Sequence, residues 1–122
     1  AKIVKLLGSI GFGSIGFAQE KAEIANSKGK VELTESKISG EYVFGLPENV
    51  TAEQVKKNSA YYTSNFTVEF NADSHESTLT LIENEVISRH VVARFLSSCG
   101  VQYIEVDGEN ITIDEFIALY LK

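Results

Sequence analysis

The amino-acid sequence predicts an α+β fold, and two observations lead to that prediction. Apolar residues recur at every second position in some segments and at every third or fourth position in others, as in half-buried strands and amphipathic helices respectively. These segments follow one another in the order strand, helix, strand, strand, helix, strand. The chain has 122 residues, of which 43% are apolar, so it is long enough for one domain with a substantial core.

Two strand signals open the pattern. Apolar residues flank a glutamate in Val31–Leu33, and a longer run over Gly40–Pro47 ends at its proline, which cannot donate to a sheet ladder. We expect Tyr42 and Phe44 to lie on opposite faces of this second strand, with at most one of them in the core.

A helix is predicted next, over Ala52–Tyr62. Thr51 precedes Gln54 by three residues, which is the spacing of a capping box at a helix start. The apolar stripe of this helix is thin, so we expect the helix to lie against a sheet and not inside a bundle.

A hairpin is predicted between the two helices. Phe66, Val68 and Phe70 alternate with polar residues, and the alternation resumes in Thr78–Ile82 after the polar turn Asn71–Glu76. Two alternating runs around a short polar turn are typical of a β-hairpin.

The second helix has the clearest amphipathic pattern, and Gly100 is suited to end it in the left-handed conformation. Its predicted apolar face consists of Ile87, Val91, Val92, Phe95, Leu96 and Cys99, and its predicted solvent face of Arg89, His90, Arg94 and Ser97. The segments expected after it are a strand over Val101–Val106, an extended piece over Ile111–Ile113, and a last helical turn carrying Phe116, Leu119 and Leu121, capped by Thr112 or Asp114.

This order of elements is that of split β-α-β repeats, so the predicted architecture is a ferredoxin-like β-α-β-β-α-β sandwich with an extra C-terminal strand and helix. Both helices would lie on one face of a mostly antiparallel sheet. A β-roll that uses Val31–Leu33 as a fifth strand is the alternative. The predicted core comprises Val43 or Phe44, Phe66, Val68, Phe70, Leu79, Leu81, Val92, Phe95, and Val101 or Tyr103.

The stretch Glu41–Val106 resembles the heavy-metal-associated domain family. The resemblance rests on element order, on VEFNADSHESTLTL, and on a helix ending SSCG before the strand VQYIEV. It implies the scaffold; the family itself binds metal through a Cys-x-x-Cys pair after its first strand. Here the corresponding loop reads GLPENVTAEQV and contains no cysteine, histidine or methionine, so the metal site is not carried over.

Residues 1–18 have the pattern of a signal peptide. Lys2 and Lys5 precede the uncharged run Leu6–Ala18, and small residues flank Phe17 as at a signal-peptidase site. This pattern predicts export to the periplasm, the cell surface or the extracellular space. The pentapeptide GSIGF occurs twice in tandem, which instead favours retention of the segment as an apolar arm.

The remaining chain is divided by composition. Residues 19–30 are polar and charged and are expected to form a linker, and residues 31–122 a single α+β domain. The formal net charge of −6 argues against nucleic acid as a partner, because such binding depends on clustered cations.

No catalytic motif is present in the sequence. Cys99 is the only cysteine and is expected to be buried and inert, while His75 and His90 are expected to lie in solvent. We therefore expect no enzyme, no cofactor, and no catalytic, cofactor-binding or metal-binding residues. The acidic turn Asp107–Asn110 leaves calcium binding open, although turn chemistry alone explains its composition.

These observations predict an exported, non-catalytic binding or structural module. It would act through its sheet face or an edge strand on a protein partner or on a second copy of itself. One alternative is a self-assembling subunit of a filament or membrane complex that uses a retained apolar arm, with membrane contact only if Ala1–Ala18 is retained. Another alternative is a metal-carrier-like protein.

Overall fold

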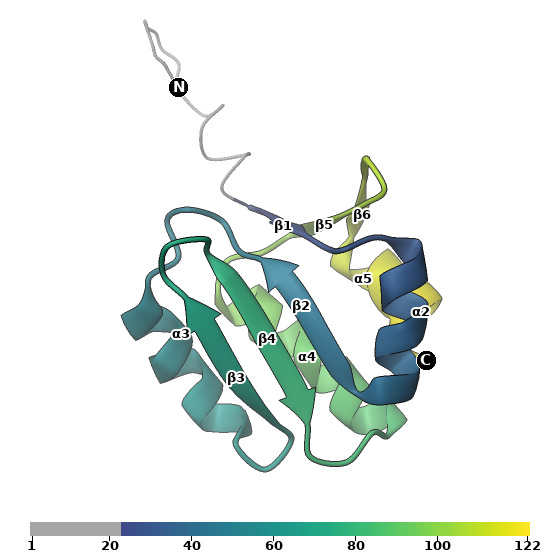
Figure 1. Ribbon diagram of the computed structural model, residues 1–122, viewed down its shortest axis with the longest axis horizontal. Coiled ribbons are helices and arrows are strands. Elements are labelled where there is room, and N and C mark those ends of the chain that lie inside the picture. Colours follow the sequence, from purple (N-terminus) through teal and green to yellow (C-terminus); the bar gives the residue numbers. More distant parts are fainter. Residues whose placement is uncertain (1–22) are drawn as a thin grey trace, which may run out of the picture.

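The computed structural model describes residues 23–122, so the predicted signal peptide lies outside the described residues (Figure 1). The first elements are β1 (Ile24–Asn26), α2 (Lys30–Ser39), β2 (Glu41–Gly45), α3 (Ala52–Ser59) and the 3-10 turn η1 (Ala60–Tyr62). They are followed by β3 (Phe66–Asn71), β4 (Glu76–Leu81), α4 (Val86–Ser98), β5 (Tyr103–Val106), β6 (Glu109–Thr112), α5 (Ile113–Phe116) and the π-helical turn η2 (Ile117–Leu121).

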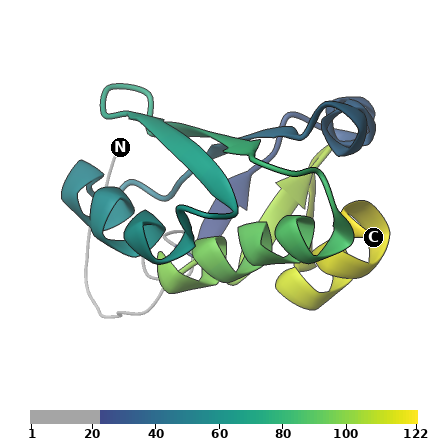
Figure 2. The same ribbon diagram turned by 90° about the horizontal axis from the view of Figure 1, so that it is seen from below.

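The described strands form one mixed sheet in the order β3-β4-β2-β1-β5-β6. β1 and β5 are parallel, and every other neighbouring pair is antiparallel. α3 and α4 lie side by side beneath the same face of this sheet (Figure 2). The predicted α+β class is therefore confirmed.

β1 corrects the prediction of a linker over residues 19–30. Its three residues pair in parallel with Tyr103–Glu105, and Ala25 is completely buried. A strand of three residues is too short to show alternation in the sequence. Its formation depends on pairing with the neighbouring strands β2 and β5. β1 meets β2 at a single pair, Asn26 and Gly45, and the two strands diverge beyond it.

Residues 31–33 form part of α2, so the strand predicted there, and the β-roll built on it, are wrong. Leu33 is the one buried residue among the ten of α2, and Val31 is 71% exposed, which suits a helix on the surface. The start of α2 is held by Asp107, whose Oδ2 accepts the N–H of Lys30 at 3.1 Å. This bond comes from the β5–β6 turn, which sequence pattern around α2 does not reveal.

The prediction that at most one of Tyr42 and Phe44 is in the core is wrong. Residues two apart in a strand share a face, and both side chains are completely buried against the helices. Their rings stack at 6.3 Å between centroids, and Phe44 meets Phe116 edge-on at 5.8 Å. The C-terminal helical turn, predicted to carry Phe116, is thus part of the same core.

Most of the predicted core is confirmed. The buried members are Phe44, Phe66, Leu79, Leu81, Val92, Phe95 and Val101. Val68 and Phe70 are only half-buried, because β3 is an edge strand, and Val43 lies on the sheet face opposite α3 and α4. Tyr103 is 39% exposed and does not belong to the core.

The buried surface of α4 differs from its predicted apolar face. Five of the six predicted apolar residues are buried, but Ile87 in the first turn is 74% exposed. Arg89, predicted to face solvent, is 9% exposed because η2 packs beside it. The end of α4 is as predicted, since Gly100 adopts a φ of 91°.

The predicted helix caps are partly confirmed. The hydroxyl of Thr51 accepts the N–H of Gln54 at 3.0 Å at the start of α3. At the start of α5, Thr112 and Glu115 form a complete capping box, so Thr112 and not Asp114 is the cap. No helix within residues 23–122 is long and apolar enough to span a membrane.

Candidate binding surface

The open face of the sheet, opposite α3 and α4, is polar over β2, β4 and β3. Threonine and glutamate side chains form cross-strand rows there, for example Thr67 beside Thr80 and Glu69 beside Thr78. None of the large exposed apolar side chains of the described residues lies on these three strands. A flat polar face without aromatic residues is a weak site for a partner.

β3 forms one edge of the sheet, and half of its peptide groups point away from the sheet. Ile82 donates its N–H to the carbonyl of Asn65 at 2.9 Å, which sets the phase of the β3–β4 ladder. Hydrogen-bonded pairs alternate along such a ladder. The N–H and C=O groups of Phe66, Val68 and Phe70 therefore point outward, along a six-residue edge without lysine or proline.

β6 forms the opposite edge of the sheet and is a shorter strand than β3. It has four residues and leads directly into α5. Asp107 and Gly108, with φ values of 52° and 89°, form the two-residue turn before it. Asp107 accepts from Lys30, as described above, and the carboxylate of Glu105 accepts the N–H of Gly108. The Glu105 carboxylate thus serves the turn and that of Asp107 the start of α2, and residues 23–122 contain no group of three or more potential metal ligands.

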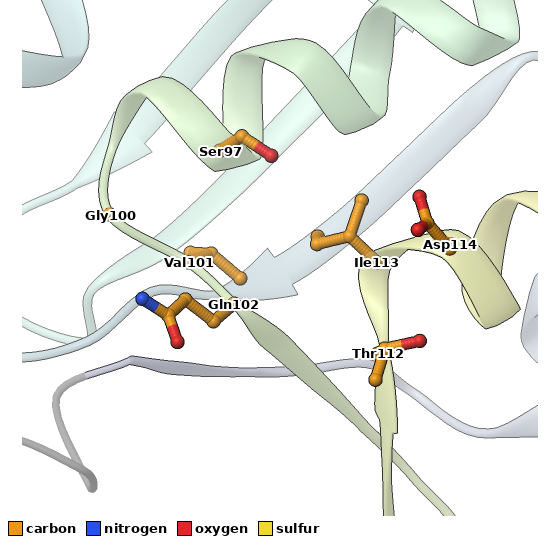
Figure 3. A pocket seen from close by; sticks show the side chains of 7 residues that line it. All are labelled: Ser97, Gly100, Val101, Gln102, Thr112, Ile113 and Asp114. Atoms are coloured by element: carbon orange, nitrogen blue, oxygen red, sulfur yellow. The ribbon is translucent and has the colours of Figure 1, made fainter.

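A shallow hollow of about 380 Å³ lies where α4 ends and α5 begins (Figure 3). Its lining residues are Ser97, Gly100, Val101, Gln102, Thr112, Ile113 and Asp114. Asp114 is the single titratable group among them, and the Thr112 hydroxyl is occupied in the capping box. A lone carboxylate offers no acid–base pair, so this hollow has no evident chemistry.

Cys99 is buried, as predicted, at the end of α4 beside α3. Asn58 donates its Nδ2–H to the carbonyl of Ser98 at 3.0 Å and approaches the Cys99 Sγ at 3.6 Å. Burial raises the pKa of the Cys99 thiol, and the hydrogen bonds from Asn58 and Ser98 oppose this shift only partly. A thiol that stays protonated and covered is a poor nucleophile.

The two histidines lie on different elements. His75 is in the β3–β4 turn with a φ of 61°, where it is half-buried and not in solvent as predicted, with its ring 5.4 Å from that of Phe70. His90 corrects the prediction that it faces solvent: it is half-buried, and its Nε2 has no partner within the described part of the chain. Tyr61, the aromatic residue expected to be most exposed, is 78% exposed on η1.

Sequence reasoning missed a polar cluster around the buried side chain of Arg89. Arg89 donates through Nε to the carbonyl of Leu121 at 3.1 Å, and Asn84 donates through Nδ2 to the carbonyls of Lys37 and Ile38. The cluster joins α2, α4 and η2. The sequence gives no signal for this cluster, because an arginine beside a histidine in an amphipathic helix normally indicates a solvent face.

No protein-family model matches this chain, and none of the curated proteins or solved structures compared with it matches either. The arguments about function therefore rest on the sequence and the geometry above.

Proposed function

We propose that the protein is an exported, non-catalytic binding module that accepts an extended segment of a protein partner along the edge of β3. The observation that carries this proposal is the row of outward peptide groups on β3. Natural proteins protect such edges with lysine, proline or bulges, because an open edge readily pairs with another strand. β3 contains none of these residues and one charged side chain, Glu69.

We also propose that the fold is an elaborated ferredoxin-like sandwich. The segment β2-α3-β3-β4-α4-β5 follows the β-α-β-β-α-β order, and β1 is inserted between β2 and β5. This insertion moves β5 away from β2, so the sheet departs from the simple four-stranded arrangement. Export is proposed on the signal-like pattern of residues 1–18 alone.

A photo-reactive residue at Thr67, whose side chain is exposed beside the free edge, tests the binding proposal. In cells of the native source we expect a covalent adduct with one protein or with a second copy of the chain. Val68→Pro should abolish the adduct, because it removes an outward N–H without removing a bond to β4. Circular dichroism checks that the variant is folded.

The same photo-reactive residue at Lys56, exposed on α3, is the matched control and should give no such adduct. Absence of an adduct at Thr67, or an adduct that persists in Val68→Pro, would contradict the proposal.

A second candidate function is self-assembly through a retained N-terminal arm. The uncharged run Leu6–Ala18 favours it, because such a segment tends to associate in water. Intact-mass measurement of the protein from its native source decides between the two candidates. A mass that begins at Gln19 supports export with cleavage and ends the self-assembly proposal, whereas a mass that includes Ala1–Ala18 in a soluble oligomer supports self-assembly.

A further inference from the structure

We infer that β2 carries a second strand-accepting site, in a groove between β2 and α2, and that this site takes an extended segment of another protein rich in lysine or arginine. The inference goes beyond the proposed function, because it concerns a different strand and names the chemistry of the partner. Three features support it: the free peptide groups of β2, the groove beside them, and the charge of the groove.

The hydrogen bonds at the two ends of β2 fix the direction of its peptide groups. Leu46 donates its N–H to the carbonyl of His75 at 2.8 Å, and Leu81 donates to the carbonyl of Gly40 at 2.9 Å. Since bonded pairs alternate along an antiparallel ladder, every second residue from Glu41 onward points its N–H and C=O away from β4.

On that side, β2 is only partly paired, although it lies inside the sheet. β1 meets it at Gly45 alone, and the N–H of Glu41 is satisfied by the Ser39 hydroxyl at 3.2 Å. Within residues 23–122, neither the N–H nor the C=O of Val43 has a hydrogen-bond partner on this side. The divergence of β1 from β2 thus leaves a donor and an acceptor free, as at a sheet edge.

α2 forms the opposite wall of a groove beside these peptide groups. The groove has a volume of about 200 Å³, and Leu33, Ser36 and Ser39 of α2 face Glu41 and Val43 of β2 across it. An added strand lies about 4.8 Å from its neighbour, but β1 already occupies that position at Gly45, and α2 joins β2 through Gly40 at the other end. A segment that enters the groove therefore pairs with the peptide group of Val43 alone.

The charge of the groove selects the partner. Its charged lining residues are Glu32, Glu35 and Glu41 against Lys28 alone. Lys28 already forms an ion pair with Glu76 of β4, and no ion pair among the described residues involves the other three carboxylates. Because alternate side chains of a strand share a face, lysines at every second position can approach these carboxylates together.

The test uses a seven-residue peptide of alternating lysine and threonine, acetylated and amidated at its ends, titrated into the full chain labelled with ¹⁵N. We expect shifts of the Val43, Ser36 and Glu35 amide signals and slower hydrogen exchange at the Val43 N–H. The double variant Glu35→Gln/Glu41→Gln should weaken binding by about fivefold, since each exposed charge pair contributes modestly. Raising the salt concentration should weaken it further.

Matched controls separate backbone pairing and charge from general attraction. Glu53→Gln/Glu69→Gln makes the same charge change outside the groove and should leave the affinity within about twofold of the unaltered chain. A peptide of alternating glutamate and threonine should not bind, and an N-methylated lysine–threonine peptide should lose binding because it cannot pair with the Val43 peptide group.

Two outcomes overturn the inference. If the lysine–threonine peptide shifts the Phe66–Phe70 amides instead, and the Glu35→Gln/Glu41→Gln variant binds it equally well, the site is at β3 and the proposed function stands. If the peptide shifts no amide of either strand, the β2 site is wrong, and the cross-linking experiment at Thr67 still decides the proposed function separately.

Discussion

The Nη1 of Arg89 lies 2.7 Å from the Oδ1 of Asn84, and this hydrogen bond joins the first turns of α4 to the loop that precedes them. Asn84 in turn binds the end of α2, and Arg89 binds the end of η2. One buried guanidinium and one amide thus connect three helical segments that are far apart in the sequence.

Arg89→Ala is expected to destabilise the fold by about 2 kcal/mol, because it leaves the buried Leu121 oxygen without its donor and removes the bond to Asn84. Urea denaturation followed by circular dichroism measures the change. Arg94→Ala on the exposed side of the same helix is the control, and its effect should stay within about 0.5 kcal/mol. Equal effects of the two substitutions would show that the cluster contributes nothing.

Tyr42→Phe is expected to leave stability at pH 7 unchanged or slightly higher, because the Tyr42 hydroxyl is buried without a partner among the described residues. Burial raises the pKa of Tyr42 to about 12, and the nearby Arg89 only partly offsets this effect. The unfolded tyrosine loses its proton near pH 10, before the folded one, so stability should fall as the pH rises from about 10 to about 12.

The measurement is the difference in unfolding free energy between the unaltered chain and Tyr42→Phe, recorded from pH 7 to pH 12. The other titrating groups are common to both proteins and cancel. A difference that stays constant across this range would contradict the assignment.

The thiol of Cys99 is expected to react with a disulfide reagent only at the rate at which the protein opens. It is buried, and its pKa is raised by that burial. The rate should rise sharply in the urea range where the fold is lost. Fast labelling of the native protein at pH 8 would show that α3 does not cover the thiol as described.

Gly29→Ala is expected to destabilise the fold by about 1–3 kcal/mol. Gly29 has a φ of 103°, and a Cβ there would lie 2.6 Å from the Oδ1 of Asp107. The clash is with a side chain, so Gly29→Ala should cost less stability in an Asp107→Ala background than in the unaltered chain. Thermal unfolding of the four proteins gives this double-mutant cycle, and purely additive effects would rule out the clash.

The elements with a strong local pattern could be predicted from the sequence. The hairpin of β3 and β4 and most buried residues of α4 follow from periodicity, and the Thr51 cap follows from its spacing to Gln54. β1 could not be predicted, because a three-residue strand between two partners carries no period of its own. Residues 31–33 of α2 resemble a strand in the sequence, because Val31 and Leu33 are too few apolar residues to distinguish the two periods.

For the candidate surface, the sequence predicts only that it is a face or a free edge of the sheet, and not which strand forms it. That a sheet has free edges follows from the fold, whereas the free peptide groups of Val43 depend on where β1 leaves β2. The burial of Arg89 likewise depends on η2, which lies more than twenty residues later in the sequence. Both are long-range arrangements that no local window contains.

The position of β1 has a consequence for the order in which the molecule is made. Ile24 pairs with Tyr103, so a strand near the start of the chain is completed by one near its end. Pairings so distant in sequence form slowly, because a long loop must first be closed. Until synthesis passes β5, β1 lacks its parallel neighbour, and the growing chain holds a half-assembled sheet in need of protection from aggregation.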